Sequence, residues 1–186
     1  MAWSPPTTVA VNDTHSASRW NTQVKANLEH LHETHGPIWI PAGGFIPDGT
    51  ATQVYDATVK AGAINFPDAS TTEAVAFGLV PADWISGGIT FTLYLQQRTA
   101  GTGNARFQIE YQFVSDAEVL AAGTALGPTD IAVPGTLNAE KLQAFTATAA
   151  PSAGELIKIV VSRIGAHAND TFAGNVGLSL LKGAYV

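Results

Sequence analysis

Two stretches of this sequence, residues 89–96 and 106–113, alternate apolar and polar side chains with a period of two. The apolar positions are Ile89, Phe91, Leu93 and Leu95 in the first stretch, and Phe107, Ile109, Tyr111 and Phe113 in the second. Successive side chains of a β-strand point to opposite faces of a sheet. The pattern therefore predicts two strands, each with one face in a core and one face turned outward.

The rest of residues 37–186 shows similar patterns in shorter pieces. Val75, Phe77 and Leu79 alternate with small residues, so we expect these three side chains to face the core. Residues 157–161 form a continuous apolar run, which predicts a central strand covered on both faces. Further strands are expected at 38–46, 52–59, 63–66, 118–122, 129–133, 142–148 and 172–180. Many short strands separated by Gly, Pro and Asp turns predict a mainly β fold, an antiparallel β-sandwich of jelly-roll type.

The loop at residues 98–104 joins the two strongest strands. It contains Gly101 and Gly103, which favours a tight connection. We expect it to close an antiparallel hairpin with Phe91 and Phe107 on the same inward face.

The N-terminal part has a different pattern. Residues 1–12 contain Pro5-Pro6 and predict an extended arm, whereas residues 13–36 predict one α-helix that ends at Gly36-Pro37. Its apolar stripe is narrow, which suits a coiled-coil-like seam or docking onto a sheet. We therefore expect three parts: the arm 1–12, the helix 13–36 and the β-sandwich domain 37–186. The residues expected to act as interface anchors are Trp3, Trp20, Val24, Leu28, Leu31 and Trp39.

Charge limits the possible partners. The chain has 15 acidic and 9 basic residues among 186, a net charge of −6, and charged residues make up only 13%. An acidic surface argues against a nucleic-acid ligand. No apolar run approaches the roughly 20 residues of a membrane span, and the N-terminus does not resemble a signal peptide. Low charge and neutral strand faces predict surface hidden between subunits, and we expect a homotrimer.

Chemical motifs are weak. His30, His32 and His35 lie close in sequence, but a helix places the first two on different sides, and we expect no metal site. Asp116 and Glu118 would share one face of a strand, as paired carboxylates of a glycosidase can. Solvated acids at a strand end are the more usual explanation. Nucleophile elbows and phosphate-binding loops are absent, so we expect no catalysis and no cofactor.

Three segments resemble a known family. The segment 20–31, WNTQVKANLEHL, resembles the W-N-x-x-V-(R/K)-x-N-L-x-x-L helix near the start of many tailed-bacteriophage virion proteins. Residues 81–94 and 169–178 are similar to the P-x-x-W…G-x-(V/I)-T and (N/S)-D-T segments of their β-rich domains. The resemblance implies a virion component with a β-sandwich body, often trimeric, whose partners are other capsid or tail proteins.

From these features we expect a non-enzymatic structural protein of a phage virion, most simply a capsid decoration or other head-associated protein. The alternative is a tail-associated module that binds a receptor or a host surface glycan. Exposed aromatic side chains separate the two: an open groove with two or more aromatic residues favours glycan binding.

Overall fold

The computed structural model describes residues 37–56, 61–82, 84 and 87–185. The chain divides into two compact units, residues 1–36 and 37–186, and the description below concerns the second. The predicted arm, helix and histidine cluster lie outside the described residues. The strands are β1 (Ile38–Pro41), β2 (Phe45–Asp48), β3 (Thr52–Asp56), β4 (Ala61–Phe66), β5 (Thr71–Leu79), β6 (Ile89–Gln97), β7 (Asn104–Val114), β8 (Thr124–Ala132), β9 (Glu140–Ala147), β10 (Leu156–Ile164) and β11 (Val176–Tyr185).

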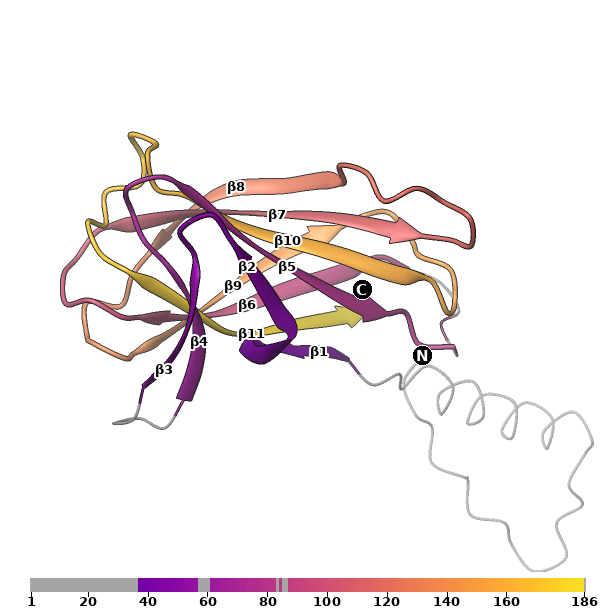
Figure 1. The fold of residues 1–186 in the computed structure, drawn as a ribbon, viewed down its shortest axis with the longest axis horizontal. Coiled ribbons are helices and arrows are strands. Elements are labelled where there is room, and N and C mark those ends of the chain that lie inside the picture. The colour runs from indigo at the N-terminus through magenta and orange to yellow at the C-terminus, as the bar shows by residue number, and fades with distance from the viewer. Residues whose placement is uncertain (1–36, 57–60, 83, 85–86, 186) are drawn as a thin grey trace, which may run out of the picture. The chain divides into compact units, whose positions relative to one another are not determined.

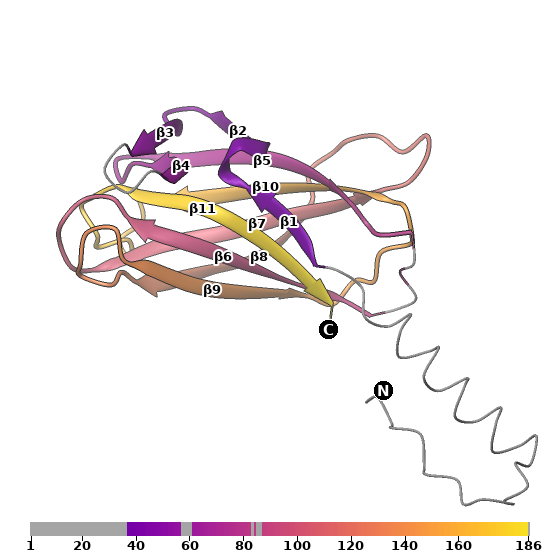
Figure 2. The ribbon, with the colours of Figure 1, turned by 90° about the horizontal axis from the view of Figure 1, so that it is seen from below.

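The strands form two sheets packed face to face (Figure 1). One has the order β3-β4-β11-β6-β9, with β1 also paired to β11, and the other has the order β2-β5-β10-β7-β8. All strand pairs are antiparallel. Figure 2 shows β11, β6 and β9 side by side in the first sheet. The predicted fold class, a mainly β antiparallel sandwich of jelly-roll type, is thus confirmed for the described unit.

The strand β10 is central, as the apolar run 157–161 predicts. It lies between β5 and β7 along its length. Ile157, Ile159 and Val161 are fully buried in the core, and Val160 on the opposite face is only 7% exposed.

The core contains the inward-facing apolar side chains of both alternating stretches, residues 89–96 and 106–113. Ile89, Phe91 and Leu93 of β6 and Phe107 and Ile109 of β7 are fully buried. Burial of each large apolar side chain contributes about 1.5–3 kcal/mol of transfer free energy to folding.

The expected hairpin between β6 and β7 is wrong. The strand β6 pairs with β11 and β9, whereas β7 pairs with β10 and β8 in the other sheet. The loop after β6 therefore crosses between sheets. Phe91 and Phe107 still face the same core, but each ring meets a partner from another strand: Phe91 lies 5.8 Å from Tyr111, and Phe107 lies 5.6 Å from Phe66, measured between ring centroids.

The expected orientation of β5 is also wrong. Its inward side chains are the small residues Ala74 and Ala76, whereas Phe77 is 43% and Leu79 is 65% exposed. The reason lies at Gly78, where an added Cβ would already be 3.3 Å from a side-chain carbon of Ile38. The side chains of β1 fill the space on this side of β5, so only small residues fit there.

Two further strand boundaries differ from the prediction. Residues 118–122 form a loop rather than a strand, and the expected strand 38–46 is two strands separated by a short 3-10 turn, Ala42–Gly44. Phe172 is 2% exposed but lies in the loop before β11, not in the strand. Trp84 is 7% exposed, as expected for a core residue. Within the described residues, no helix has the length and apolar character needed to cross a bilayer.

Candidate cleft beside the end of strand β7

The end of β7 has a neighbour on one side only. The pairing of β7 with β8 stops at Tyr111, opposite Thr124, while the pairing with β10 continues to Val114. The edge of residues 112–114 away from β10 is therefore not covered by β8. The connecting segment 115–123, which we call the β7–β8 loop, leaves the sheet at this point.

A side chain of β7 holds the β7–β8 loop in place. The amide of Gln112 donates through Nε2 to the carbonyl of Val119 at 3.0 Å and accepts through Oε1 from the N–H of Ala121 at 3.0 Å. Lys158 of β10 donates from Nζ to the carbonyl of Ala121 at 2.9 Å. These bonds satisfy backbone groups that no strand partner reaches.

The ends of the loop are bound by carboxylates. Glu155 accepts from the hydroxyl of Ser115 at 2.7 Å and from the N–H of Ser152 at 2.6 Å. The Ser152 N–H is the main reason that the pKa of Glu155 is lowered. The serine hydroxyls add to this effect, and burial opposes it. Glu110 accepts from the N–H of Gly123 at 2.8 Å. A turn at the start of the loop is closed by Glu118, which accepts from the N–H of Ser115 at 3.1 Å.

These elements enclose an open cleft of about 510 Å³. Its lining residues are Tyr111, Gln112, Phe113, Glu118, Val119, Ala121, Ala122, Gly123, Thr124 and Ala149. The rings of Tyr111 and Phe113 lie 5.1 Å apart at an angle of 58°. Phe113 is half-buried and contributes apolar surface to the lining, whereas Tyr111 is only 5% exposed and its ring packs in the core near Phe91. Backbone groups, an amide and one carboxylate supply the polar part.

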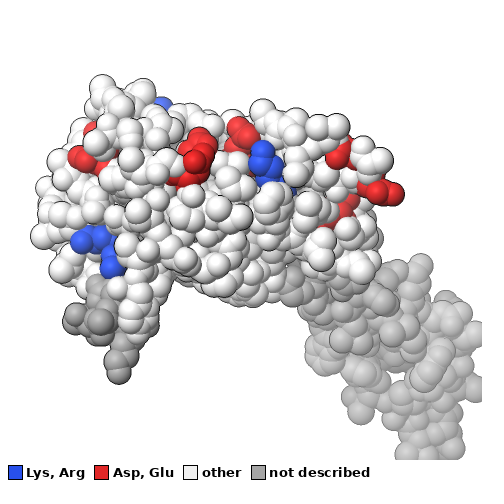
Figure 3. Space-filling model, in the orientation of Figure 1, with Lys and Arg blue, Asp and Glu red and all other residues white. Residues whose placement is uncertain are grey.

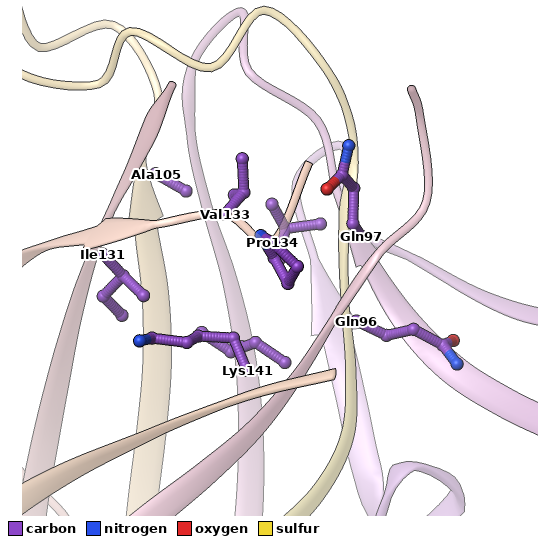
Figure 4. A pocket seen from close by; sticks show the side chains of 9 residues that line it. Gln96, Gln97, Ala105, Ile131, Val133, Pro134 and Lys141 are labelled. Atoms are coloured by element: carbon purple, nitrogen blue, oxygen red, sulfur yellow. The ribbon is translucent and has the colours of Figure 1, made fainter. Parts of the chain in front are cut away.

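A second, smaller pocket lies near the C-terminal end of β6 (Figure 4). It is lined mainly by Leu95, Ala105, Ile131, Val133 and Pro134, with the amine of Lys141 at its border. Its volume of about 10 Å³ leaves space for about one water molecule. The larger cleft is therefore the better candidate for a ligand site.

Of the residues predicted as anchors, one lies in the described unit. Trp39 in β1 is 51% exposed, and Nζ of Lys182 lies 5.3 Å from its ring centroid. Trp3, Trp20, Val24, Leu28 and Leu31 lie outside the described residues. Asp116 and Glu118 are exposed and lie in the β7–β8 loop, so the expectation that they share a strand face is wrong.

The cleft itself was not predicted. Tyr111 and Phe113 follow the core alternation, and Gln112 has the pattern of an ordinary outward residue. A single signal was present: the segment after β7 holds three small residues, Ala121-Ala122-Gly123, which permit close approach to a neighbouring strand. At Gly123 an added Cβ would lie 2.3 Å from the carbonyl oxygen of Tyr111. Among the described residues, no group of three His, Asp or Glu is placed to hold a metal ion.

Comparison with known proteins identifies the class of fold. A family 35 carbohydrate-binding module from Clostridium thermocellum is 15% identical and has a TM-score of 0.54, and the match covers 82% of this chain and 100% of that one. The carbohydrate-binding module CBM6cm-2 of lichenase 5A from Cellvibrio mixtus, in complex with cellotriose, is 14% identical with a TM-score of 0.50, covering 80% and 96%.

These likenesses show that residues 37–186 have the β-sandwich fold found in carbohydrate-binding modules. At this level of identity they show the fold alone. No family model and no curated protein matches the sequence. None of the comparisons indicates a phage virion protein.

Proposed function

We propose that the unit 37–186 binds a glycan in the cleft beside β7 and catalyses no reaction. The observation that carries the proposal is the cleft itself, whose volume of about 510 Å³ falls within the range typical of small-ligand sites. The half-buried Phe113 offers ring surface for the apolar C–H groups of a sugar. Gln112, Glu118 and the loop backbone offer partners for its hydroxyls.

Of the two aromatic residues in this lining, Phe113 is half-buried and Tyr111 is only 5% exposed, so the support for the glycan-binding alternative over capsid decoration comes from the size of the cleft and its polar groups. The likeness to carbohydrate-binding modules agrees with this choice, although it bears on the fold only. For the decoration role the described residues offer no specific observation.

The test is to obstruct the cleft without removing core side chains. Ala149 lines the cleft and is exposed, so Ala149→Trp should fill it while leaving the fold intact. Ala173 is also exposed but lies after β10, whereas Ala149 precedes it, which places the two at opposite ends of that strand. Ala173→Trp is therefore the matched control. Calorimetric titration of the full chain with a panel of oligosaccharides should show binding that is lost in Ala149→Trp and kept in Ala173→Trp.

We propose that residues 1–36 attach the protein to a virion, and that the tail is the favoured place of attachment. The predicted anchors Trp3, Trp20, Val24, Leu28 and Leu31, together with a trimeric state, would join the glycan-binding unit to the particle. Deletion of residues 1–12 tests this proposal. The truncated protein should fold but fail to join particles, and unchanged incorporation would argue against the attachment.

A further inference from the structure

Four carboxylates lie in the β7–β8 loop or bind it, and one of them, Glu118, lines the cleft. Asp116 and Glu118 belong to the loop, and Glu110 and Glu155 bind its two ends. In the described part of the chain, the cationic side chain bound to this loop is Lys158, whose Nζ donates to the carbonyl of Ala121. The cleft lining itself includes Glu118 and no Lys, Arg or His. The lining therefore carries a negative charge at Glu118 and no positive charge.

Figure 3 shows few charged side chains on the visible face, most of which is uncharged. Arg106, the arginine of β7, pairs with Asp130 of β8 near the end of these strands that lies away from the β7–β8 loop. At the β7–β8 loop, Lys158 brings one positive charge against the four carboxylates named above.

Glu118 is the charged group best placed to contact a ligand. One of its oxygens, Oε2, accepts from the N–H of Ser115. A carboxylate has about four acceptor positions and no donor, so it can accept further hydrogen bonds from sugar hydroxyls. A ligand that brings a carboxylate, sulfate or phosphate to the same place meets repulsion instead.

We propose that Glu118 makes this cleft selective for uncharged glycans over glycans that carry acidic groups. This inference rests on the proposed glycan-binding function. At a separation of about 4 Å in water-like surroundings, one like charge weakens binding about fivefold, and partial removal of water increases the factor. The effect should fall with added salt, because the Debye length shrinks from roughly 10 Å at 0.1 M to about 3 Å at 1 M.

The experiment titrates the full chain with two sets of oligomers. The neutral probes are cellohexaose, xylohexaose and mannohexaose, and the acidic probes are oligomers of glucuronic, galacturonic and mannuronic acid. Titrations at low salt and at high salt separate the electrostatic contribution. Glu118→Gln removes the charge but keeps an acceptor for the Ser115 N–H. Glu140→Gln is the matched control, because Glu140 is an exposed carboxylate at the start of β9, away from Ala149, which follows that strand.

We expect at least one neutral oligomer to bind with an affinity that changes little with salt. Acidic oligomers should bind at least fivefold more weakly at low salt and should improve at high salt. Glu118→Gln should reduce the discrimination and leave neutral binding within about twofold, while Glu140→Gln changes neither. Equal or tighter binding of acidic oligomers at low salt would overturn the selectivity inference but not the proposed glycan binding. The same holds if Glu118→Gln still prefers neutral oligomers as strongly as the parent protein does. Absence of binding to every oligomer would overturn the proposed function as well.

Discussion

Arg163 and Asp170 form an ion pair in which neither side chain has any exposed surface. The contact is bidentate: Nε of Arg163 lies 2.9 Å from Oδ2, and Nη2 lies 2.8 Å from Oδ1. The remaining guanidinium hydrogens are donated to the carbonyls of Phe66, Phe172 and Gly174. All five donors of the guanidinium are thereby used. The pair ties the loop between β10 and β11 to the end of β4.

Removing one member of this pair should strongly destabilise the domain. Arg163→Met leaves a buried carboxylate without its partner, and such changes cost about 3–5 kcal/mol. The control is Arg106→Met, because the pair Arg106–Asp130 is partly exposed and should contribute about 1 kcal/mol or less. Urea denaturation of both variants measures the difference. Similar small losses in both would contradict the importance of the buried pair.

Phe91 and its neighbour Thr92 should respond very differently to truncation. Phe91 is fully buried and contacts Tyr111 of the opposite sheet, so Phe91→Ala should lower the free energy of unfolding by about 3–5 kcal/mol. Thr92 lies on the outward face of β6 and is half-buried, and Thr92→Ala should cost less than about 1 kcal/mol. Thermal melts compare the two. A large loss in Thr92→Ala would indicate that a second subunit covers this face.

Glu155 should make the stability of the β7–β8 loop depend on pH. Its pKa is lowered in the folded state, so its contribution is complete above the unfolded pKa of about 4.3 and is lost as the pH falls through the folded value. Glu155→Gln should therefore be less stable than the parent at pH 7, by about 1 kcal/mol given its partial exposure. The difference should vanish toward pH 3. Denaturation curves at both pH values test the sign, and a difference that grows in acid would refute it.

Gly165 should tolerate no side chain. An added Cβ would lie 2.0 Å from the backbone oxygen of Asp68, so Gly165→Ala must displace the turn between β4 and β5. We expect a loss of about 1–3 kcal/mol. Gly43→Ala is the control, because its nearest atom would be a side-chain nitrogen of Gln53 at 3.7 Å, an ordinary contact. The midpoint of unfolding of Gly43→Ala should stay close to that of the parent protein, as for a neutral substitution on the surface.

The local patterns in the sequence predicted the strands well but not their partners. Alternation at Ile89, Phe91 and Leu93 is a property of one strand, and the structure confirms both the strand and its inward face. The choice of partner for β6 depends on residues far along the chain, so adjacency in sequence misled the hairpin prediction. On β5 the larger side chains face outward, because packing against Ile38 overrides the preference for burying bulk.

The cleft could not be predicted from the sequence, because it also depends on how strands pair. It exists because the pairing of β7 with β8 stops at Tyr111, before β7 ends, and because Gln112 and Lys158 hold the intervening loop. The point at which two strands stop pairing leaves no periodic pattern in the sequence. A hydrogen bond from a side chain to a loop backbone leaves none either. Phe113 fits the core pattern and nevertheless lines an open surface, so its double role becomes visible only with the strand ends in place.

The position of β11 also sets the order in which the molecule can form. This strand pairs with β1, β4 and β6, which precede it by many residues, and it lies at the centre of its sheet. During synthesis those strands emerge first and wait with unpaired edges until residues 176–185 leave the ribosome. Sheets built from such distant pairings form slowly, and their early chains are prone to aggregate. Yield in the cell should therefore depend on chaperones that cover these edges while the last strand is being made.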